Sequence, residues 1–130
     1  MHGDDLIFVY GTLRRGGSHH RLLDGARMLG PWTSGPHYNM LDMGPYPALV
    51  AGKGRVIGEV YRIEHGMLPA LDAYEGCPGD YRRVRITTPY GEAWLYLWDR
   101  AAPPAPVVPG GDWLRHLSRG GLRPIGPAAR

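Results

Sequence analysis

Leu6-Ile-Phe-Val-Tyr10, continued by Gly11-Thr-Leu-Arg-Arg-Gly-Gly17, is the stretch that decides the fold. Its first five residues are apolar without alternation, which is typical of a strand covered on both faces. The glycines that follow predict a tight bend where the strand ends. Such a bend can point backbone N–H groups at an anion. More often, however, glycines at this position only allow the chain to turn where a strand ends.

Further strand-like segments follow, separated by glycine and proline. They are Ala26–Trp32, His37–Asp42, Arg55–Ile63, Tyr81–Thr88 and Glu92–Trp98. Gly44-Pro-Tyr-Pro47 predicts a turn or an extended loop, because proline cannot donate to a strand ladder. With one clear helix at Gly66–Glu75, five or six short strands predict an α+β fold built as a small mixed β-barrel.

The length of 130 residues predicts a single domain. We expect this domain to span residues 1–119, with a proline-rich linker at residues 100–111. Asp112 is placed to cap a short helix, Trp113–Arg119, and the glycine- and proline-rich residues 120–130 predict a frayed tail.

Composition excludes several classes of protein. A single cysteine, Cys77, rules out a disulfide framework and a multi-cysteine metal site, and a small buried thiol is the expected form of this residue. No apolar run approaches the ~20 residues of a membrane span, and the N-terminus lacks the pattern of a signal peptide. We therefore expect a cytoplasmic protein with no membrane contact.

The net charge is +3, and short arginine clusters carry much of it. Arg82, Arg83 and Arg85 fall on a predicted strand, where a solvated face is the simplest interpretation. Weak nucleic-acid binding through these residues is a minor alternative, because no long basic stripe with interleaved aromatic residues is present. We expect no nucleic-acid partner.

Glu75 is the most informative acidic residue. On a helical wheel it falls inside the apolar stripe, between Leu68 and Leu71. Burial of a carboxyl group raises its pKa, which suits a group that takes and returns a proton near neutral pH. The alternative is a helix-end glutamate that reaches solvent or pairs with an arginine of Arg82–Arg85.

Other polar clusters predict less. His19, His20 and Asp24 could ligate a metal, but no second cluster completes the coordination, so we expect no metal. Glu59 shares a strand face with apolar residues, so we expect an inward-pointing side chain with a hydrogen-bonded structural role.

Six segments, in this order, resemble the γ-glutamylcyclotransferase-like family in its short bacterial, AIG2-like branch. They are Val9–Leu13, Tyr46–Ala48, Val56–Tyr61, Leu71–Gly76, Tyr81–Arg83 and Gly111–Trp113. Val9-Tyr-Gly-Thr-Leu13 matches the family's Tyr-Gly-[Ser/Thr]-Leu loop, and Leu71-Asp-Ala-Tyr-Glu-Gly76 matches its Leu-Asp-x-x-Glu-Gly helix end. The resemblance covers residues 6–116.

The resemblance implies a small, mostly antiparallel barrel with flanking short helices and a cavity at one end. It implies that Tyr10, Gly11, Thr12 and Leu13 hold the α-carboxylate of a glutamyl substrate through backbone N–H groups. Glu75 would be the catalytic acid and base. The α-amine of the substrate would attack its own γ-carbonyl and yield 5-oxoproline and a free amine, with no cofactor or metal.

The same resemblance places Tyr81 in the pocket wall. Strand alternation puts Tyr81 on the face opposite Val84 and Ile86. We therefore expect it to enter the pocket only if it precedes the regular strand or lies at a bulge.

The Thr12-Leu13 form of the loop favours the branch that acts on γ-glutamyl amines, so a small γ-glutamyl molecule is the expected partner. A non-catalytic protein that binds a carboxylate metabolite in the same pocket is the alternative function. The oligomeric state is left open.

Overall fold

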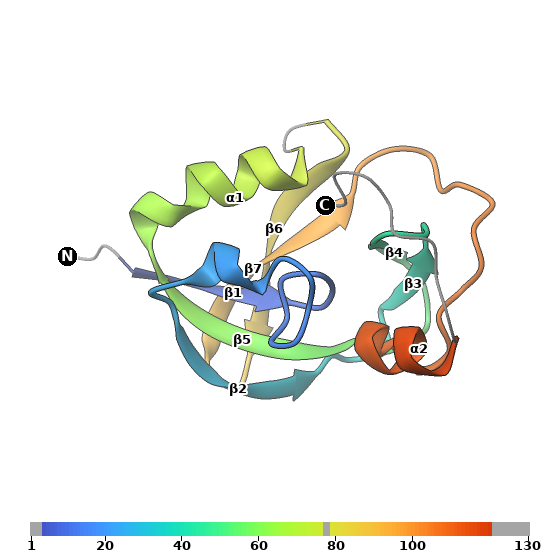
Figure 1. Cartoon of the computed structure of the whole chain (residues 1–130), viewed down its shortest axis with the longest axis horizontal. Coiled ribbons are helices and arrows are strands. Elements are labelled where there is room, and N and C mark those ends of the chain that lie inside the picture. The colour runs from blue at the N-terminus through green and yellow to red at the C-terminus, as the bar shows by residue number, and fades with distance from the viewer. Residues whose placement is uncertain (1–3, 77–78, 121–130) are drawn as a thin grey trace.

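A computed structural model describes residues 4–76 and 79–120 and contains two sheets (Figure 1). In spatial order, the five strands of the larger sheet are β2 (Arg27–Thr33), β5 (Ile57–Glu64), β1 (Asp4–Val9), β7 (Gly91–Trp98) and β6 (Tyr81–Thr88). The smaller sheet pairs β3 (Tyr38–Asp42) with β4 (Pro47–Ala51). The predictions for the Cys77 thiol and for tail residues 121–130 lie outside the described residues.

β1 is the central strand, as its unbroken apolar sequence predicts. It pairs antiparallel with β5 and parallel with β7, so neighbours satisfy its backbone on both edges. Ile7 and Val9 face one apolar cluster, whereas Phe8 faces another. The expected strand with two covered faces is confirmed, and both apolar clusters use it as their shared wall.

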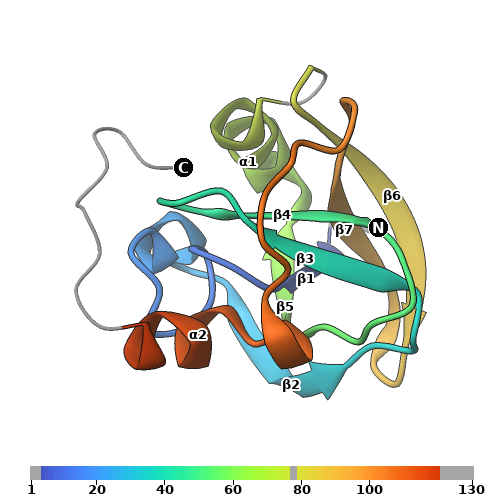
Figure 2. The same cartoon turned by 90° about the vertical axis from the view of Figure 1, so that its right-hand side faces the viewer.

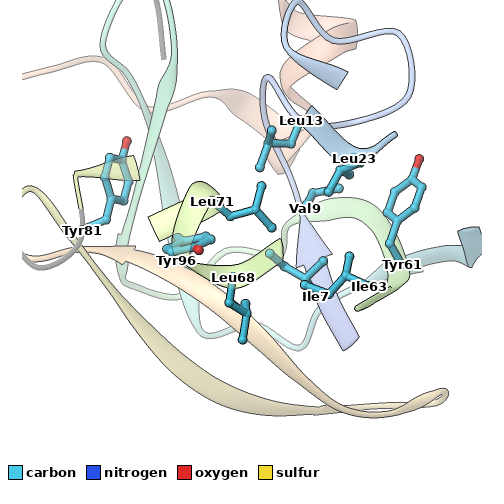
Figure 3. Packing of buried hydrophobic residues seen from close by; sticks show 10 residues of the cluster. All are labelled: Ile7, Val9, Leu13, Leu23, Tyr61, Ile63, Leu68, Leu71, Tyr81 and Tyr96. Carbon is cyan, nitrogen blue, oxygen red and sulfur yellow. The ribbon is translucent and has the colours of Figure 1, made fainter. Parts of the chain in front are cut away.

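Helix α1 (Leu68–Glu75) covers the first cluster (Figure 3). A 3₁₀ turn, η2 (His65–Met67), precedes it, and a proline occupies its first turn, where no backbone N–H is needed. Gly76 ends the helix in the left-handed conformation with φ of 66°. Leu68 and Leu71 point into the cluster, so the predicted apolar stripe is confirmed.

The opposite face of the larger sheet is covered by β3, β4 and helix α2 (Trp113–Arg119) (Figure 2). The chain between β7 and α2 crosses the smaller sheet, where Asp42 N–H donates to the Pro106 carbonyl over 2.8 Å. A 3₁₀ turn, η3 (Pro109–Gly111), leads to Asp112, whose side chain accepts from the N–H of Arg115, as predicted for a cap. Trp113 anchors α2 in the second cluster, with 1% of its surface exposed.

Two local features refine the predictions. The α+β class is confirmed, but the described strands form two separate sheets and do not close into a barrel. Pro47 begins β4 and does not belong to a turn, because the first position of an edge strand needs no donor. Ser18 caps no helix: it contacts His19, and the following 3₁₀ turn, η1 (His20–Leu23), has no side-chain cap.

Gly58 lies in the interior of β5, where a side chain would overlap the backbone carbonyl of Val9. The close approach of β1 therefore explains why this strand carries a glycine. Among the described residues, no helix is both long enough and apolar enough to cross a membrane.

Candidate active site

A pocket opens where β1 ends and the two apolar clusters meet. Its empty volume is about 360 Å³, part of which is open to solvent. Its walls come from four parts of the chain: the end of β1 with its loop, the segment before β4, the end of α1, and the β6–β7 pair. The lining residues are Phe8, Val9, Tyr10, Gly11, Thr12, Leu13, Tyr46, Pro47, Glu75, Tyr81 and Tyr96.

Two carbonyl groups of the loop after β1 accept backbone hydrogen bonds from residues further along the chain. The Gly11 carbonyl accepts from Arg14 N–H over 3.0 Å, and the Thr12 carbonyl accepts from His19 N–H over 2.9 Å. In a trans peptide the C=O and the following N–H point in opposite directions. The N–H groups of Thr12 and Leu13 therefore point away from the Arg14 and His19 amides that hold the loop from behind.

Two glycines allow this compact loop. A Cβ at Gly11 would lie 2.7 Å from Cγ of Pro47, so only glycine lets the loop approach β4. A Cβ at Gly17 would overlap the Thr12 carbonyl, which is the same group that His19 holds. Both glycines are therefore required because other atoms of the chain come too close for a side chain. They do more than end the strand, which was the simpler interpretation of the sequence.

An ion-pair network supports the loop from the other side. Arg14 Nε donates to Glu59 over 2.6 Å, and the second Glu59 oxygen accepts the backbone N–H of Arg15 over 2.9 Å. Arg14 also donates to Asp112, the cap of α2, over 2.9 Å. Only 6% of the Glu59 side chain is exposed. Glu59 therefore points inward and is hydrogen-bonded, as predicted, and it ties β5, the loop and α2 together.

Glu75 forms another part of the pocket wall, half-buried at the last position of α1. It shares the pocket with Tyr10, Gly11, Thr12 and Leu13, which stand more than sixty positions earlier in the chain. Burial raises the pKa of Tyr10 well above its usual value, and the neighbouring Tyr81 and Glu75 raise it further.

Tyr81 lies in the pocket wall without any bulge. It is the first residue of β6, pairs in register with Trp98, and donates from its hydroxyl to the Pro47 carbonyl over 2.8 Å. Val84 and Ile86 do lie on the opposite face, but that face packs on the second cluster. The expectation that a bulge or an irregular position is required is therefore wrong, because β6 is covered on both faces and the pocket lies on the Tyr81 side.

The arginines of β6 pair with residues other than Glu75. Arg83 Nε donates to Asp72 over 2.8 Å, and Arg82 pairs with Asp99 over 3.1 Å in an exposed position. The guanidinium of Arg85 lies 4.3 Å from the ring centroid of Trp94. Each of the three arginines thus contacts the protein's own surface.

Two residues that the sequence did not indicate also contact the site. The Tyr74 hydroxyl lies 2.6 Å from Oγ1 of Thr12 and so links α1 to the loop. The Tyr96 hydroxyl donates to Asp72 over 2.7 Å, while its carbonyl accepts from the Tyr10 hydroxyl over 2.6 Å. The aromatic face of the last strand was visible in the sequence, but its link to Asp72 depends on how α1 packs over β7.

The possible metal ligands His19, His20 and Asp24 do not form a metal site in the described part of the chain. Among the described residues, no group of three or more His, Cys, Asp or Glu side chains is placed to hold an ion. The His19 ring packs near Tyr74, with 5.1 Å between centroids, and His20 Nδ1 lies 2.9 Å from the Leu13 carbonyl. Both histidines therefore pack around the loop and α1.

Comparison with known proteins gives consistent results. Residues 7–115 match the family model described as "Gamma-glutamyl cyclotransferase, AIG2-like". The chain is 41% identical to a putative gamma-glutamylcyclotransferase of Vibrio cholerae, over 86% of this chain and 97% of that one. It is 36% identical to the human gamma-glutamylaminecyclotransferase, over 79% of this chain and 72% of that one.

A solved structure shares the fold. The crystal structure of an uncharacterized protein from Pyrococcus horikoshii superimposes with a TM-score of 0.78 at 30% identity, covering 90% of this chain and 98% of that one. The family model spans most of the chain, and the loop and helix-end motifs that carried the resemblance lie inside the matched region. The chain therefore belongs to the gamma-glutamyl cyclotransferase, AIG2-like family.

Proposed function

We propose that this protein is a γ-glutamylcyclotransferase that acts on small γ-glutamyl amines, with Glu75 as its acid and base. Family membership supports cyclotransferase chemistry. The name of the human relative, a gamma-glutamylaminecyclotransferase, supports the class of substrate. The Thr12-Leu13 form of the loop favours the same class.

One observation carries the proposal: Glu75 and the Tyr10–Leu13 loop line the same pocket. The loop offers N–H groups that suit an anion, and the helix end offers a carboxylate. An α-amino acid carries both an anionic carboxylate and a cationic ammonium. A wall of amide donors opposite a single carboxylate matches that pair of charges.

The first step is the attack of the amine. The α-ammonium of the substrate cannot attack until it loses a proton, and Glu75 takes that proton. The neutral amine then forms a bond to the γ-carbonyl carbon of the same molecule, which closes a five-membered ring. Because both reacting groups belong to one substrate, the pocket contributes mainly by holding it folded.

The second step is the departure of the amine. Negative charge that develops on the γ-carbonyl oxygen can be stabilised by N–H groups of the loop near Gly11–Leu13. Glu75 returns its proton to the departing nitrogen as the bond to the γ-carbon breaks. Of the three α-ammonium protons, one stays on the ring nitrogen and two leave with the amine as its ammonium form. The products are 5-oxoproline and the free amine.

The test is 5-oxoproline release from a panel of γ-glutamyl amines, measured by mass spectrometry. Replacing Glu75 with Gln preserves its shape but removes proton transfer, so kcat should fall at least ~100-fold. Glu64→Gln is the matched control, because Glu64 is an exposed glutamate at the end of β5, remote from the pocket lining. Undiminished turnover by the Glu75→Gln variant would falsify the assigned role.

The alternative function, binding of a carboxylate metabolite without catalysis, predicts a different result with the same compounds. A protein that only binds a carboxylate metabolite would bind γ-glutamyl compounds or 5-oxoproline in calorimetry and release no product. That result would replace the enzymatic proposal with a binding role for the same pocket.

A further inference from the structure

Asp72 lies at a point where three elements meet beside the pocket. It belongs to α1, and its Oδ1 accepts both the Nε–H of Arg83 from β6 and the hydroxyl of Tyr96 from β7. Asp72 itself does not line the pocket, whereas Tyr96 does. Asp72 thus accepts two hydrogen bonds from other elements while lying three residues before Glu75, so its role extends beyond the stability of the helix.

Asp72 and Glu75 are neighbours on the surface of α1. Residues three apart on a helix have Cβ atoms about 5–6 Å from each other, so a long side chain that reaches one can swing to the other. Arg83 reaches Asp72 from the neighbouring strand. Tyr96 donates to Asp72 and lines the same pocket as Glu75. Burial raises the pKa of its phenol, Asp72 and Glu75 raise this pKa further, and Arg83 lowers it.

The consequences of an Arg83–Glu75 ion pair would be severe for the proposed chemistry. A guanidinium bound to Glu75 would stabilise the carboxylate and weaken it as a base. A hydroxyl of Tyr96 that donated to Glu75 would act in the same direction. Asp72 is the competing acceptor for both donors, and only 21% of its side chain is exposed.

We propose that Asp72 is a positioning residue that binds Arg83 and Tyr96 and thereby keeps both donors from pairing with Glu75. This inference rests on the proposed function of Glu75. It explains why the end of α1 that carries Glu75 also carries a second carboxylate, Asp72, three residues earlier.

The test must separate the effect of the Arg83 charge on Glu75 from the effects of the other groups around the pocket. The other described residues that line its pocket are uncharged: the phenols Tyr10, Tyr46, Tyr81 and Tyr96, the hydroxyl-bearing Thr12, and apolar residues or glycine. Of the charged partners described around Tyr96, Arg83 is the cation. A change of Arg83 therefore probes one charge at a time.

The experiment compares the effect of Arg83→Ala in two backgrounds, with Asp72 present and with Asp72→Ala. The readout that needs no turnover is the pH midpoint at which the side-chain carboxyl ¹³C resonance of Glu75 titrates. Without Asp72, removing Arg83 should raise this midpoint by about one pH unit or more, because a cation near the carboxylate is lost. With Asp72 present, the same change should move it by less than about half a unit.

Turnover gives the second readout. Asp72→Ala should lower kcat about tenfold with little change in KM, and the Asp72→Ala/Arg83→Ala double variant should recover most of that loss. The conservative Asp72→Asn variant keeps an oxygen acceptor and should lie between wild type and Asp72→Ala. Arg82→Ala is the control, since its exposed pair with Asp99 faces away from this cluster.

An equal effect of Arg83→Ala on the Glu75 midpoint in both backgrounds overturns the inference. A double variant that is as slow as Asp72→Ala, or slower, overturns it as well and indicates a purely structural ion pair. A wild-type protein that releases no 5-oxoproline would refute the proposed function, whereas the titration would still decide whether Asp72 holds Arg83 away.

Discussion

The two walls of the pocket are built and held in different ways. The loop wall, which would bind substrate through backbone N–H groups under the proposed function, is supported by the buried Arg14–Glu59 pair, with 12% and 6% of the side chains exposed. The helix wall offers one side chain, Glu75, on a helix seated by Leu68 and Leu71 in an apolar cluster. Its polar support, Arg83–Asp72, is more exposed, at 24% and 21%.

This difference shows where each wall can be changed. A backbone donor has no side chain to replace, so the loop wall can be altered only through its supports. A side-chain group can be removed directly while its helix stays in place. We therefore expect variants of the loop wall to reduce stability and activity together, whereas Glu75→Gln reduces activity alone.

The largest expected loss of stability comes from Glu59→Ala. This change leaves the Arg14 guanidinium and the Arg15 N–H without their buried acceptor. Breaking a buried pair from one side costs about 3–5 kcal/mol of unfolding free energy. Urea unfolding measures this loss, and Glu59→Gln, which keeps one acceptor oxygen, should lose less. A loss below 1 kcal/mol for Glu59→Ala would show that the loop does not depend on this support.

Leu71→Ala tests the helix wall through its packing. Leu71 is 1% exposed beneath α1, so truncation leaves a cavity and should cost about 2–5 kcal/mol. Unlike Glu59→Ala, it should not make the stability more sensitive to salt, because it removes no charge. Thermal unfolding at low and high ionic strength compares the two variants. A salt-dependent loss in Leu71→Ala would contradict the distinction between the walls.

The smallest expected effect concerns the bond that links the walls, between Thr12 Oγ1 and the Tyr74 hydroxyl. Thr12→Val keeps the shape and removes the hydroxyl, which should cost about 1 kcal/mol of unfolding free energy. Thr87→Val is the matched control, because Thr87 makes an exposed bond of 3.1 Å to Glu92 and should lose less. Equal losses would mean that the link between the walls is no stronger than a surface contact.

Much of the fold was predictable because its signals are local. The unbroken apolar run of β1, the proline and glycine that bound α1, and the alternation of β6 and β7 each constrain the backbone near themselves. β4 was not predicted because its strand pairing depends on β3 and on an edge position that accepts Pro47. The prediction that Tyr81 enters the pocket only if it precedes the regular strand or lies at a bulge was wrong, because alternation shows two faces but not which face lines the pocket.

The candidate site divides in the same way. The motif residues Tyr10–Leu13, Glu75 and Tyr81 were identified from the sequence, and the structure brings them to one pocket. The contributions of Tyr74 and Asp72 were not predicted, since their partners Thr12, Tyr96 and Arg83 lie on other elements. Helical periodicity gives the direction of a side chain, but it does not give the residue that it meets.

The amino-acid sequence by itself determined most of the strands and both α-helices, where α1 ends, and which acidic residue lies on its apolar face. It could do so because backbone preferences and periodic burial act over a few neighbouring residues. Only the tertiary structure decided that Arg83 pairs with Asp72, that Glu59 supports the loop, and that Tyr81 faces the pocket. Those outcomes depend on distances between residues far apart in the chain, and packing alone sets them.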